Sequence, residues 1–283
     1  MPRVRKIVIF ANLDKPHAQE MAEAIIAKLL QLGFIADLHS SLRFCDHPAL
    51  EGAELAISLG GDGTVLATAR YVSSWNIPIF PINLGNFGFI TEFGKDDWEG
   101  ELVDYLAATP RFNERLMLAV AVERSGMEVF RELALNDVVV TGAGISKLIK
   151  LQLSLEKAVL GIYRADGMII ATPTGSTAYS AAAGGPILSP GMAGIIVNPI
   201  CPFTLSHRPV VLPATETITV AVYQQQRSAV LLTVDGQITF GLEEGDVIKI
   251  KTAPQPARIA YCTRRNFYDV LRTKLNWSGG PDA

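Results

Sequence analysis

A carboxylate set among glycines is the part of this sequence best suited to chemistry. Asp62 lies in the run Gly60-Gly61-Asp62-Gly63-Thr64, which follows apolar residues 55–59 and precedes 65–70. The pattern predicts a strand, a tight turn and a helix, because glycines let a backbone turn sharply and approach a ligand closely. Open α/β sheets bind ligands at the carboxyl ends of their strands, and amides that open a helix can face phosphate. A carboxylate beside such amides indicates phosphoryl transfer, which depends on positioning and a proton acceptor.

The same turn could also be a purely structural helix cap, since Asp is a favoured capping residue. A cap would need at most one glycine, so three glycines around Asp62 favour a functional role. The run is neither a Walker A loop nor a Gly-x-Gly-x-x-Gly motif.

A polar pair, Asn136-Asp137, interrupts an apolar stretch between residues 133–135 and 138–140. Burying polar groups is costly unless they are hydrogen-bonded. A β-bulge or a turn with an Asx bond would satisfy them, and so would a ligand. Taken alone, the pair supports both explanations equally.

Residues 172–186 combine hydroxyl groups, small side chains and glycines: Thr-Pro-Thr-Gly-Ser-Thr-Ala-Tyr-Ser-Ala-Ala-Ala-Gly-Gly-Pro. We expect a helix to start near Ser176, where amides and hydroxyls suit the sugar or phosphate groups of a nucleotide. Tyr179 could stack on the ligand or bond to it. A tightly packed alanine helix is the structural alternative, and the density of hydroxyl groups disfavours it.

Several charged residues flank these motifs. Arg164 and Asp166 could form a surface ion pair of little energetic value, while Lys147 and Lys150 could be solvated strand residues. Together they offer the local positive charge that a net charge of −3 otherwise lacks. The run Asp235-Gly236-Gln237 most simply predicts a hairpin turn.

The surrounding pattern predicts two domains. In the first third, strands at 6–11, 34–38, 55–59 and 77–82 alternate with helices at 18–32 and 96–108, which indicates a mostly parallel sheet covered by helices. After Pro110, short strands rich in β-branched residues indicate an all-β, sandwich-like domain: residues 116–122, 128–140, 147–155, 168–171, 217–223, 229–234 and 246–250. A last helix at 267–275 is expected to return to the first domain. The fold class is therefore α+β, with a Rossmann-like α/β domain at 1–111, joined by 266–283, and a β-rich domain at 112–265.

Composition narrows the class of protein further. The 283 residues are 49% hydrophobic and 19% charged, which suits a globular chain with a sizeable core. The acidic balance disfavours a nucleic-acid or membrane-surface role. Cys45, Cys201 and Cys262 are scattered, and the four histidines lack metal-ligand spacing, so we expect a reduced cytoplasmic protein without structural zinc. No apolar run approaches a membrane span.

These residues resemble the NAD kinase family. The three runs Gly60–Thr64, Leu135-Asn136-Asp137-Val138 and Thr172–Ser180 look like its three signatures in order and spacing, with Arg164-Ala165-Asp166-Gly167 upstream of the third and Asp235-Gly236-Gln237 near the end. The resemblance covers nearly the whole chain. The first signature is shared with diacylglycerol kinases, sphingosine kinases and phosphofructokinases, whereas the third is much more particular.

The resemblance implies Mg²⁺-dependent transfer of the ATP γ-phosphoryl group to the 2′-hydroxyl of the adenosine ribose of NAD, giving NADP. Asp62 would accept the proton of that hydroxyl. The Gly60, Gly61, Gly63 and Thr64 amides would line the nucleotide site, and Asn136 and Asp137 would hold NAD hydroxyls. Further contacts are implied by family position for Lys147, Arg164, Asp166, Thr174, Thr177, Ala178, Tyr179, Ser180, Ala181, Ala182 and Gln237. Family members are usually homodimers or homotetramers, and Mg²⁺ would arrive with ATP.

One position departs from the family pattern. Ala67 stands where many members carry a long basic or polar side chain. The phosphoryl donor therefore stays open between ATP, another nucleotide and polyphosphate, and Arg70, one turn further along, is a candidate replacement. The sequence also leaves open NAD against NADH as acceptor and feedback by NADPH.

Two other functions are compatible with the first motif. A lipid or sphingoid kinase would share the Gly-Gly-Asp-Gly turn, but the hydroxyl-rich segment 172–182 argues against an apolar groove. A non-catalytic dinucleotide sensor would have no need of the Asp62 carboxylate.

Overall fold

A computed structural model describes residues 5–40, 50–85, 88–144, 148–204, 206–223, 226, 228–261 and 266–275. The chain divides into two compact units, Met1–Glu114 with Ala257–Ala283, and Arg115–Pro256. From the sequence, we expect the first domain to end at residue 111 and to resume at 266, so both boundaries differ from those of the structure. Strands β6 (Phe112–Arg115) and β19 (Ala257–Ala260) both belong to the sheet of the first unit.

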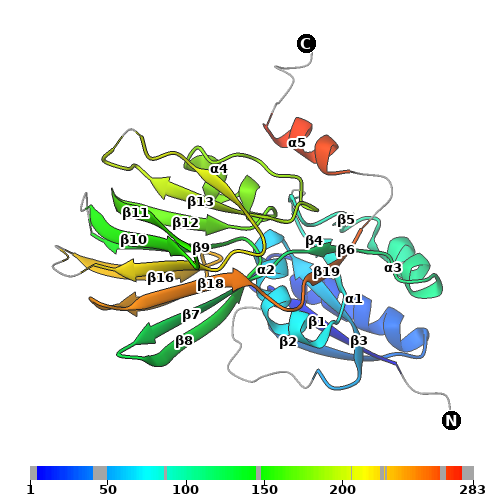
Figure 1. The fold of residues 1–283 in the computed structure, drawn as a ribbon. Coiled ribbons are helices and arrows are strands. Elements are labelled where there is room, and N and C mark those ends of the chain that lie inside the picture. The colour runs from blue at the N-terminus through cyan, green and yellow to red at the C-terminus, as the bar shows by residue number, and fades with distance from the viewer. Residues whose placement is uncertain are drawn as a thin grey trace. The chain divides into compact units, whose positions relative to one another are not determined.

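The first unit is built on a seven-stranded sheet (Figure 1) with the order β2-β1-β3-β4-β19-β6, and β5 pairs with β4. The pairings among β1 to β5 are parallel, as expected from alternating strands and helices. The remaining strands are β1 Lys6–Ala11, β2 Ile35–Ser40, β3 Ala53–Gly60, β4 Ile79–Asn83 and β5 Phe93–Gly94. The helices are α1 Ala18–Gln31, α2 Asp62–Val72, η1 Ser73–Trp75, α3 Trp98–Ala107 and α5 Phe267–Leu275.

Alternation along the buried strands places helices on both faces of this sheet. Ile7 and Ile9 of β1 share a core cluster with Ile25 of α1 and Leu102 of α3. Phe10, which points the other way, stacks on Tyr71 of α2 with ring centroids 6.3 Å apart. Since successive strand residues point to opposite faces, α1 and α2 cover opposite faces of the sheet.

The second unit contains two antiparallel sheets of six strands, in the orders β11-β10-β15-β18-β7-β8 and β14-β13-β12-β9-β16-β17. Side chains from both sheets form a single core cluster, so the sheets pack face to face as a sandwich. The strands of the first sheet are β7 Leu118–Arg124, β8 Met127–Ala134, β10 Ile149–Leu155, β11 Ala158–Ala165, β15 Ile218–Val222 and β18 Val247–Thr252. Those of the second are β9 Asp137–Ala143, β12 Gly167–Ala171, β13 Gly194–Ile200, β14 Val210–Pro213, β16 Ala229–Val234 and β17 Ile238–Leu242.

The second sheet is buried on both faces where it carries β12. Met168 and Ile170 point into the sandwich core, whereas Ile169 and Ala171 pack with Leu188 on the outer face. A 3-10 turn, η2 (Gly175–Thr177), and a four-residue helix, α4 (Tyr179–Ala182), follow β12. The continuous apolar run 168–171 is therefore explained by burial on two sides.

One local expectation was wrong, and another was met only by short helical segments. The stretch 128–140 is not one strand, because β8 ends at Ala134 and β9 begins at Asp137. The helix expected to start near Ser176 is present as the 3-10 turn η2 and the four-residue helix α4, and the Ser176 hydroxyl donates to Pro173 O at 2.6 Å within that turn. Such a side-chain bond to the local backbone competes with α-helix formation.

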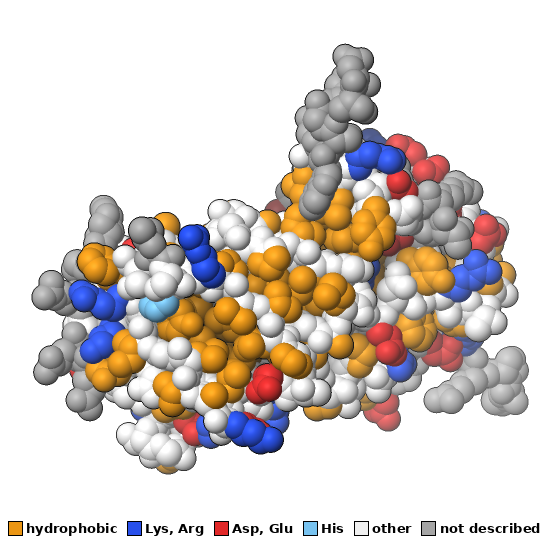
Figure 2. Space-filling view, turned by 45° about the horizontal axis from the view of Figure 1, so that its top comes forward, with side chains coloured by type: hydrophobic (Ala, Val, Ile, Leu, Met, Phe, Trp, Pro, Cys, Tyr) orange, Lys and Arg blue, Asp and Glu red, His pale blue; other side chains and the backbone are white. Residues whose placement is uncertain are grey.

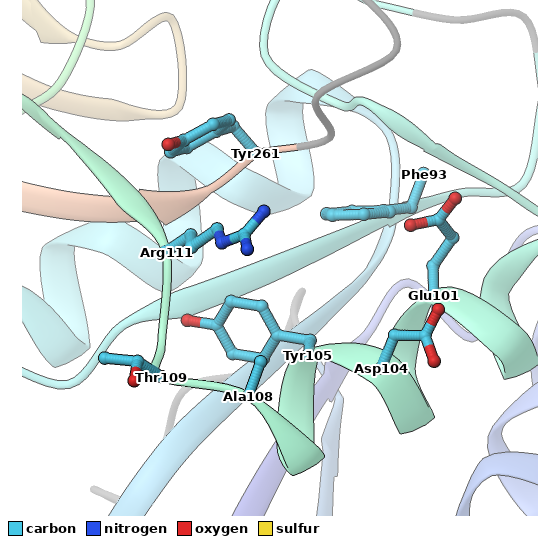
Figure 3. A pocket seen from close by; sticks show the side chains of 8 residues that line it. All are labelled: Phe93, Glu101, Asp104, Tyr105, Ala108, Thr109, Arg111 and Tyr261. Atoms are coloured by element: carbon cyan, nitrogen blue, oxygen red, sulfur yellow. The ribbon is translucent and has the colours of Figure 1, made fainter.

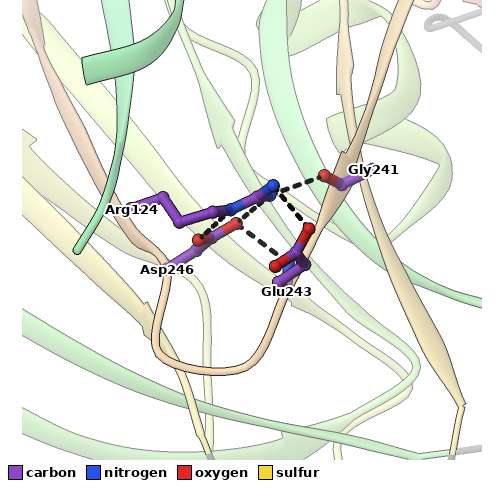
Figure 4. A network of polar contacts seen from close by, with 4 residues as sticks. All are labelled: Arg124, Gly241, Glu243 and Asp246. Atoms are coloured by element: carbon purple, nitrogen blue, oxygen red, sulfur yellow. Dashed lines mark hydrogen bonds and ion pairs between the residues drawn. The ribbon is translucent and has the colours of Figure 1, made fainter. Parts of the chain in front are cut away.

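An ion-pair network ties β7 to the turn between β17 and β18 (Figure 4). Arg124 donates to both oxygens of the fully buried Asp246, at 2.9 and 2.8 Å, and to Glu243 at 2.5 Å. Burial alone would raise the pKa of Asp246, but the bonds from Arg124 and the Glu243 amide outweigh it and lower the pKa. The network closes one end of the sandwich.

Candidate active site

Asp62 is the first residue of α2, directly after the glycine turn that the sequence predicts. Gly60 ends β3, and Gly61, with extended backbone, is the N-cap of the helix. A Cβ built on Gly60 would lie 2.0 Å from Thr64 Oγ1, so no larger residue fits there. The predicted order of strand, turn and helix is confirmed for residues Gly60, Gly61, Asp62, Gly63 and Thr64.

The Asp62 carboxylate is held by a loop that sequence reasoning missed. The Phe89 amide donates to Oδ2 at 2.8 Å, and the Ile90 and Thr91 amides donate to Oδ1 at 3.2 Å. The Thr91 hydroxyl also donates to Oδ1 at 3.2 Å. Each carboxylate oxygen has about two lone-pair sites, so three donors saturate Oδ1, while Oδ2 accepts from Phe89 alone among the described residues and keeps one site open. No signal in the sequence near Asp62 points to partners 27–29 residues away.

A second missed residue supplies positive charge to the turn. A Cβ built on Gly61 would lie 3.1 Å from Nζ of Lys15. Lys15 follows β1, and β1 and β3 are parallel neighbours whose carboxyl ends meet at one sheet edge. After β1 the chain crosses to β2 on one side and then to β3 on the other, so this edge is the topological switch point, where open α/β sheets bind ligands.

In the second unit, Asn136 and Asp137 lie at the turn between β8 and β9. The carboxylate of Asp235 accepts hydrogen bonds from the amides of Leu135, Asn136 and Asp137, at 3.1, 2.7 and 3.2 Å. Asp235 itself has a positive φ of 50°, in the turn between β16 and β17. The hairpin turn predicted at 235–237 thus also fixes the polar pair that lies 98–99 residues earlier.

A cavity of about 380 Å³ opens beside this turn and brings four predicted site residues together. Its lining consists of Asn136, Asp137, Val139, Thr141, Ala178, Tyr179, Thr233, Asp235 and Gly236. A Cβ built on Gly175 would lie 2.1 Å from the backbone oxygen of Asn136, so the glycine allows the hydroxyl-rich segment to approach the pair. Tyr179 is 46% exposed at the rim.

Two carboxylates share this cavity, and one of them titrates abnormally. Asp137 is only 4% exposed. Burial first, and the nearby charge of Asp235 second, raise the pKa of Asp137 to about 7. At neutral pH the pocket therefore contains a carboxyl group that can donate or accept a hydrogen bond.

The other predicted residues are not in the lining of this cavity. Ser180 is fully buried, and its Oγ lies 3.3 Å from Nδ2 of Asn198. Arg164 makes no ion pair with Asp166, and its guanidinium lies 5.3 Å from the centre of the Phe203 ring. Thr174 Oγ1 is buried without a hydrogen-bond partner. Thr177, Ala181 and Ala182 belong to η2 and α4, Gln237 follows the 235–236 turn, and Lys147 is outside the described residues.

A further cavity, of about 250 Å³, lies in the first unit between α3 and the end of β19 (Figure 3). The Arg111 side chain extends between the rings of Tyr105 and Tyr261. Burial raises the pKa of Tyr105 to about 12, so its phenol stays neutral. None of the predicted site residues lines this cavity.

Within the described residues, no three His, Cys, Asp or Glu side chains are grouped to hold a metal ion. The same residues include no helix long and apolar enough to cross a membrane.

A glycine turn that opens a helix at a sheet switch point suits the phosphate groups of a nucleotide. Two family models match the sequence: the ATP-NAD kinase N-terminal domain over residues 40–109 and the C-terminal domain over 135–261. The NAD kinase of Treponema denticola is 43% identical over 98% of both chains. The NAD kinase of Geobacter sulfurreducens is 39% identical over 97% of this chain and 99% of its own. The chain belongs to the NAD kinase family and is an enzyme of that phosphotransferase class.

Solved structures agree on the fold. A yeast NADH kinase complexed with NADH matches with a TM-score of 0.83, covering 99% of this chain and 89% of that one, at 23% identity. An NAD kinase from Archaeoglobus fulgidus in complex with ATP matches with a TM-score of 0.76 and 25% identity, covering 96% and 99%. The α/β domain, the β-sheet domain and the C-terminal helix are confirmed.

Proposed function

We propose that this enzyme transfers the γ-phosphoryl group of ATP to the 2′-hydroxyl of the adenosine ribose of NAD, giving NADP and ADP. The observation that carries this proposal is the fixed carboxylate of Asp62 at the switch point of the first sheet, in a glycine turn that the Lys15 ammonium approaches at Gly61. A relative solved with ATP and a relative solved with NADH support nucleotides of these two kinds as substrates. The proposal includes a cytoplasmic location, which rests on the scattered cysteines.

Asp62 acts as the proton acceptor in this proposal. The ribose hydroxyl loses its proton as its oxygen attacks phosphorus, so the base is needed only while the new bond forms. Oδ1 already accepts from three donors, whereas Oδ2 accepts from the Phe89 amide, so the ribose hydroxyl can donate to the open lone pair of Oδ2. Oδ2 is therefore the oxygen that takes the substrate proton in this proposal, and the three donors to Oδ1, each at 3.2 Å, hold the carboxylate from the other side.

In this proposal, Lys15 and the start of α2 bind the phosphates of the donor. The ammonium of Lys15 and the amides of the first helical turn offer positive charge to the donor phosphates. Ala67 is buried in α2, and its side chain can make no polar contact with the phosphates.

The described residues suit a Mg²⁺ ion that arrives bound to ATP. Since they hold no cluster of three acidic or imidazole ligands, the phosphates and water would supply most of the coordination. When bound, Mg²⁺ neutralises charge developing on the phosphates.

NAD is assigned to the cavity of the second unit. Asn136 offers an amide side chain whose buried Oδ1 has no partner, and Asp137 offers a carboxyl group. Ribose hydroxyls both donate and accept, so such a pair suits them. Tyr179 can cover a ring at the rim. The remaining contacts stay predictions from family position: Lys147, Arg164, Asp166, Thr174, Thr177, Ala178, Ser180, Ala181, Ala182 and Gln237.

A homodimer or homotetramer is part of the proposal. Hydrophobic side chains gather on one face of the molecule (Figure 2). In the second unit, β11 and β14 are the terminal strands of their sheets on the same side of the sandwich, and both expose apolar residues: Val159, Leu160, Ile162, Val210 and Val211. Edge strands with apolar side chains favour pairing with another chain. Sedimentation of the wild type and of Ile162→Lys tests this, and a monomeric wild type would refute it.

A coupled assay tests the reaction itself. The enzyme is given NAD, ATP and Mg²⁺, and an NADP-specific dehydrogenase reports the product. We expect NADP from the wild type and at least a thousandfold less from Asp62→Asn with NAD binding retained. Equal rates in the two proteins would refute the proposal, and NAD binding without turnover in the wild type would indicate a sensor. Replacing ATP by other nucleotides or polyphosphate, and NAD by NADH, defines donor and acceptor.

A further inference from the structure

Thr91 lies at the centre of a buried hydrogen-bond network behind Asp62. Its hydroxyl oxygen accepts from Asn83 Nδ2 at 2.9 Å and from the Gly88 amide at 3.0 Å, and it lies 3.2 Å from Asp62 Oδ1. Thr91 and Asn83 are each 2% exposed. The Asn83 side chain is itself fixed, because its Oδ1 accepts from the Gly85 amide at 2.9 Å.

The direction of the Thr91 hydroxyl follows from counting donors and acceptors. A hydroxyl group has one hydrogen to donate and two lone pairs to accept with. Asn83 and Gly88 are donors only at the atoms concerned, so they occupy both lone pairs. The single hydrogen must then point at the remaining neighbour, which is Oδ1 of Asp62.

We propose that Thr91 is a positioning residue that fixes the Asp62 carboxylate in the orientation needed to accept the substrate proton. The proposal rests on the proposed function of Asp62. Among the four donors to this carboxylate, only the Thr91 hydroxyl comes from a side chain, so it is the one that a substitution can remove while leaving the backbone intact. Hydrogen bonds to charged groups are stronger than neutral ones, so without the hydroxyl the carboxylate is held by the three backbone amides alone and is less firmly oriented.

The role has a distinct kinetic consequence. Thr91 is too deeply buried to touch a substrate, so its removal should change the rate of the chemical step and leave NAD binding alone. A misplaced base lowers kcat, whereas a lost substrate contact would raise KM. A merely structural threonine would change stability without this division.

The experiment compares three variants in the coupled assay, with NAD binding and thermal unfolding measured in parallel. Thr91→Val removes the hydroxyl at constant shape, and Thr91→Ser keeps it. Thr68→Val is the matched control, because Thr68 is another fully buried threonine whose hydroxyl donates only to the Thr64 carbonyl of its own helix, at 2.8 Å.

We expect Thr91→Val to lower kcat about tenfold with KM for NAD within twofold, the loss of one charge-assisted hydrogen bond. Thr91→Ser should return kcat to within threefold of the wild type, and Thr68→Val should keep it. If Thr91→Val is too unstable to assay, Thr91→Cys, with a much weaker donor, takes its place with the same expected loss.

Three results would overturn the inference: an unchanged kcat without the hydroxyl, an equal loss in Thr91→Ser, or an equal loss in Thr68→Val. Failure of the proposed function is distinguishable, because then the wild type makes no NADP or Asp62→Asn is as active as the wild type. An inactive Asp62→Asn beside a fully active Thr91→Val rejects the role of Thr91 alone.

Discussion

The two units of this enzyme each contain a carboxylate that binds three successive backbone amides from a distant segment. In the first unit, Asp62 binds the amides of 89–91, and in the second, Asp235 binds those of 135–137. The two sets of hydrogen bonds have opposite roles. Around Asp62 the amides fix the acid, which is itself the reactive group. Around Asp235 the acid fixes the amides, and the functional groups are the side chains that those residues carry.

The two sites also differ in how their charge is balanced. Asp62 receives four donors and is half-buried at a helix N-terminus, which favours a negative charge. Asp235 lies beside a second, almost fully buried carboxyl group, Asp137, whose pKa is raised to about 7. The comparison indicates that the first site stabilises the negative charge of its carboxylate. In the second site, Asp137 loses its negative charge when it is protonated, at a pH of about 7.

The largest predicted effect concerns the pH dependence of stability through Asp137. Its pKa is about 7 in the folded state and ordinary in the unfolded state, so the folded state binds more protons between these values. The favourable contribution of protonated Asp137 to the free energy of unfolding is therefore complete at low pH, and it is lost as pH rises towards and through 7. A shift of about three pKa units corresponds to roughly 4 kcal/mol as an upper estimate.

Denaturant unfolding at pH 5 and pH 8 checks this, with Asp137→Asn as a permanently neutral replacement. The wild type should lose stability relative to Asp137→Asn as pH rises. Asp246→Asn is the contrasting control, because Asp246 has a lowered pKa and stabilises the fold above its ordinary pKa, so at pH 8 its removal costs stability. Parallel profiles for the wild type and Asp137→Asn would contradict the comparison.

A methyl group at position 88 should disable the first site without unfolding it. A Cβ on Gly88 would lie 1.8 Å from Oδ1, 2.2 Å from Cγ and 2.3 Å from Oδ2 of Asp62, so the whole carboxylate must move away from its donors at 89–91. We expect Gly88→Ala to lower kcat at least a hundredfold, about 2.7 kcal/mol, with stability within about 1 kcal/mol of the wild type. Gly85→Ala, whose Cβ would meet nothing closer than 3.9 Å, is the control and should keep its kcat.

The same substitution of glycine by alanine at position 175 should lower the stability of the second unit, in contrast to Gly88→Ala. A Cβ on Gly175 would lie 2.1 Å from the backbone oxygen of Asn136, which cannot rotate away. We expect Gly175→Ala to lower the free energy of unfolding by about 2 kcal/mol and to weaken NAD binding, because the 135–137 segment must shift. Thermal unfolding and NAD titration measure both. Gly191→Ala, with open space at its Cβ, should change neither, and a stable Gly175→Ala with normal NAD affinity would be inconsistent with the role given to this segment.

The parts of the fold that could be predicted are those with local causes. The apolar strands β1, β3 and β4, the helix α1 and the glycine turn all follow from short patterns around them. The partners of Asp62 and Asp235 could not be predicted, because they lie 27–29 and 98–100 residues away. The break between β8 and β9 has the same origin, since the amides of 135–137 bond to Asp235 and not to a neighbouring strand.

The position of Lys15 could be predicted only in part, and replacing this lysine should have the smallest effect of these substitutions. The strand before Lys15 was predicted. The position of Lys15 opposite Gly61, however, depends on β1 and β3 being neighbours in the sheet. We expect Lys15→Met to raise KM for ATP about tenfold, about 1.4 kcal/mol, while kcat and KM for NAD stay within threefold. Lys28→Met is the control. Lys28 lies in the last turn of α1, where its Nζ pairs with Glu99 at 2.8 Å. Because a helix between parallel strands runs back towards their amino ends, Lys28 lies away from the switch point, and its removal should leave KM for ATP unchanged. A rise in KM for NAD with Lys15→Met would assign this lysine to the acceptor, and the separation of roles between the two units would then be wrong.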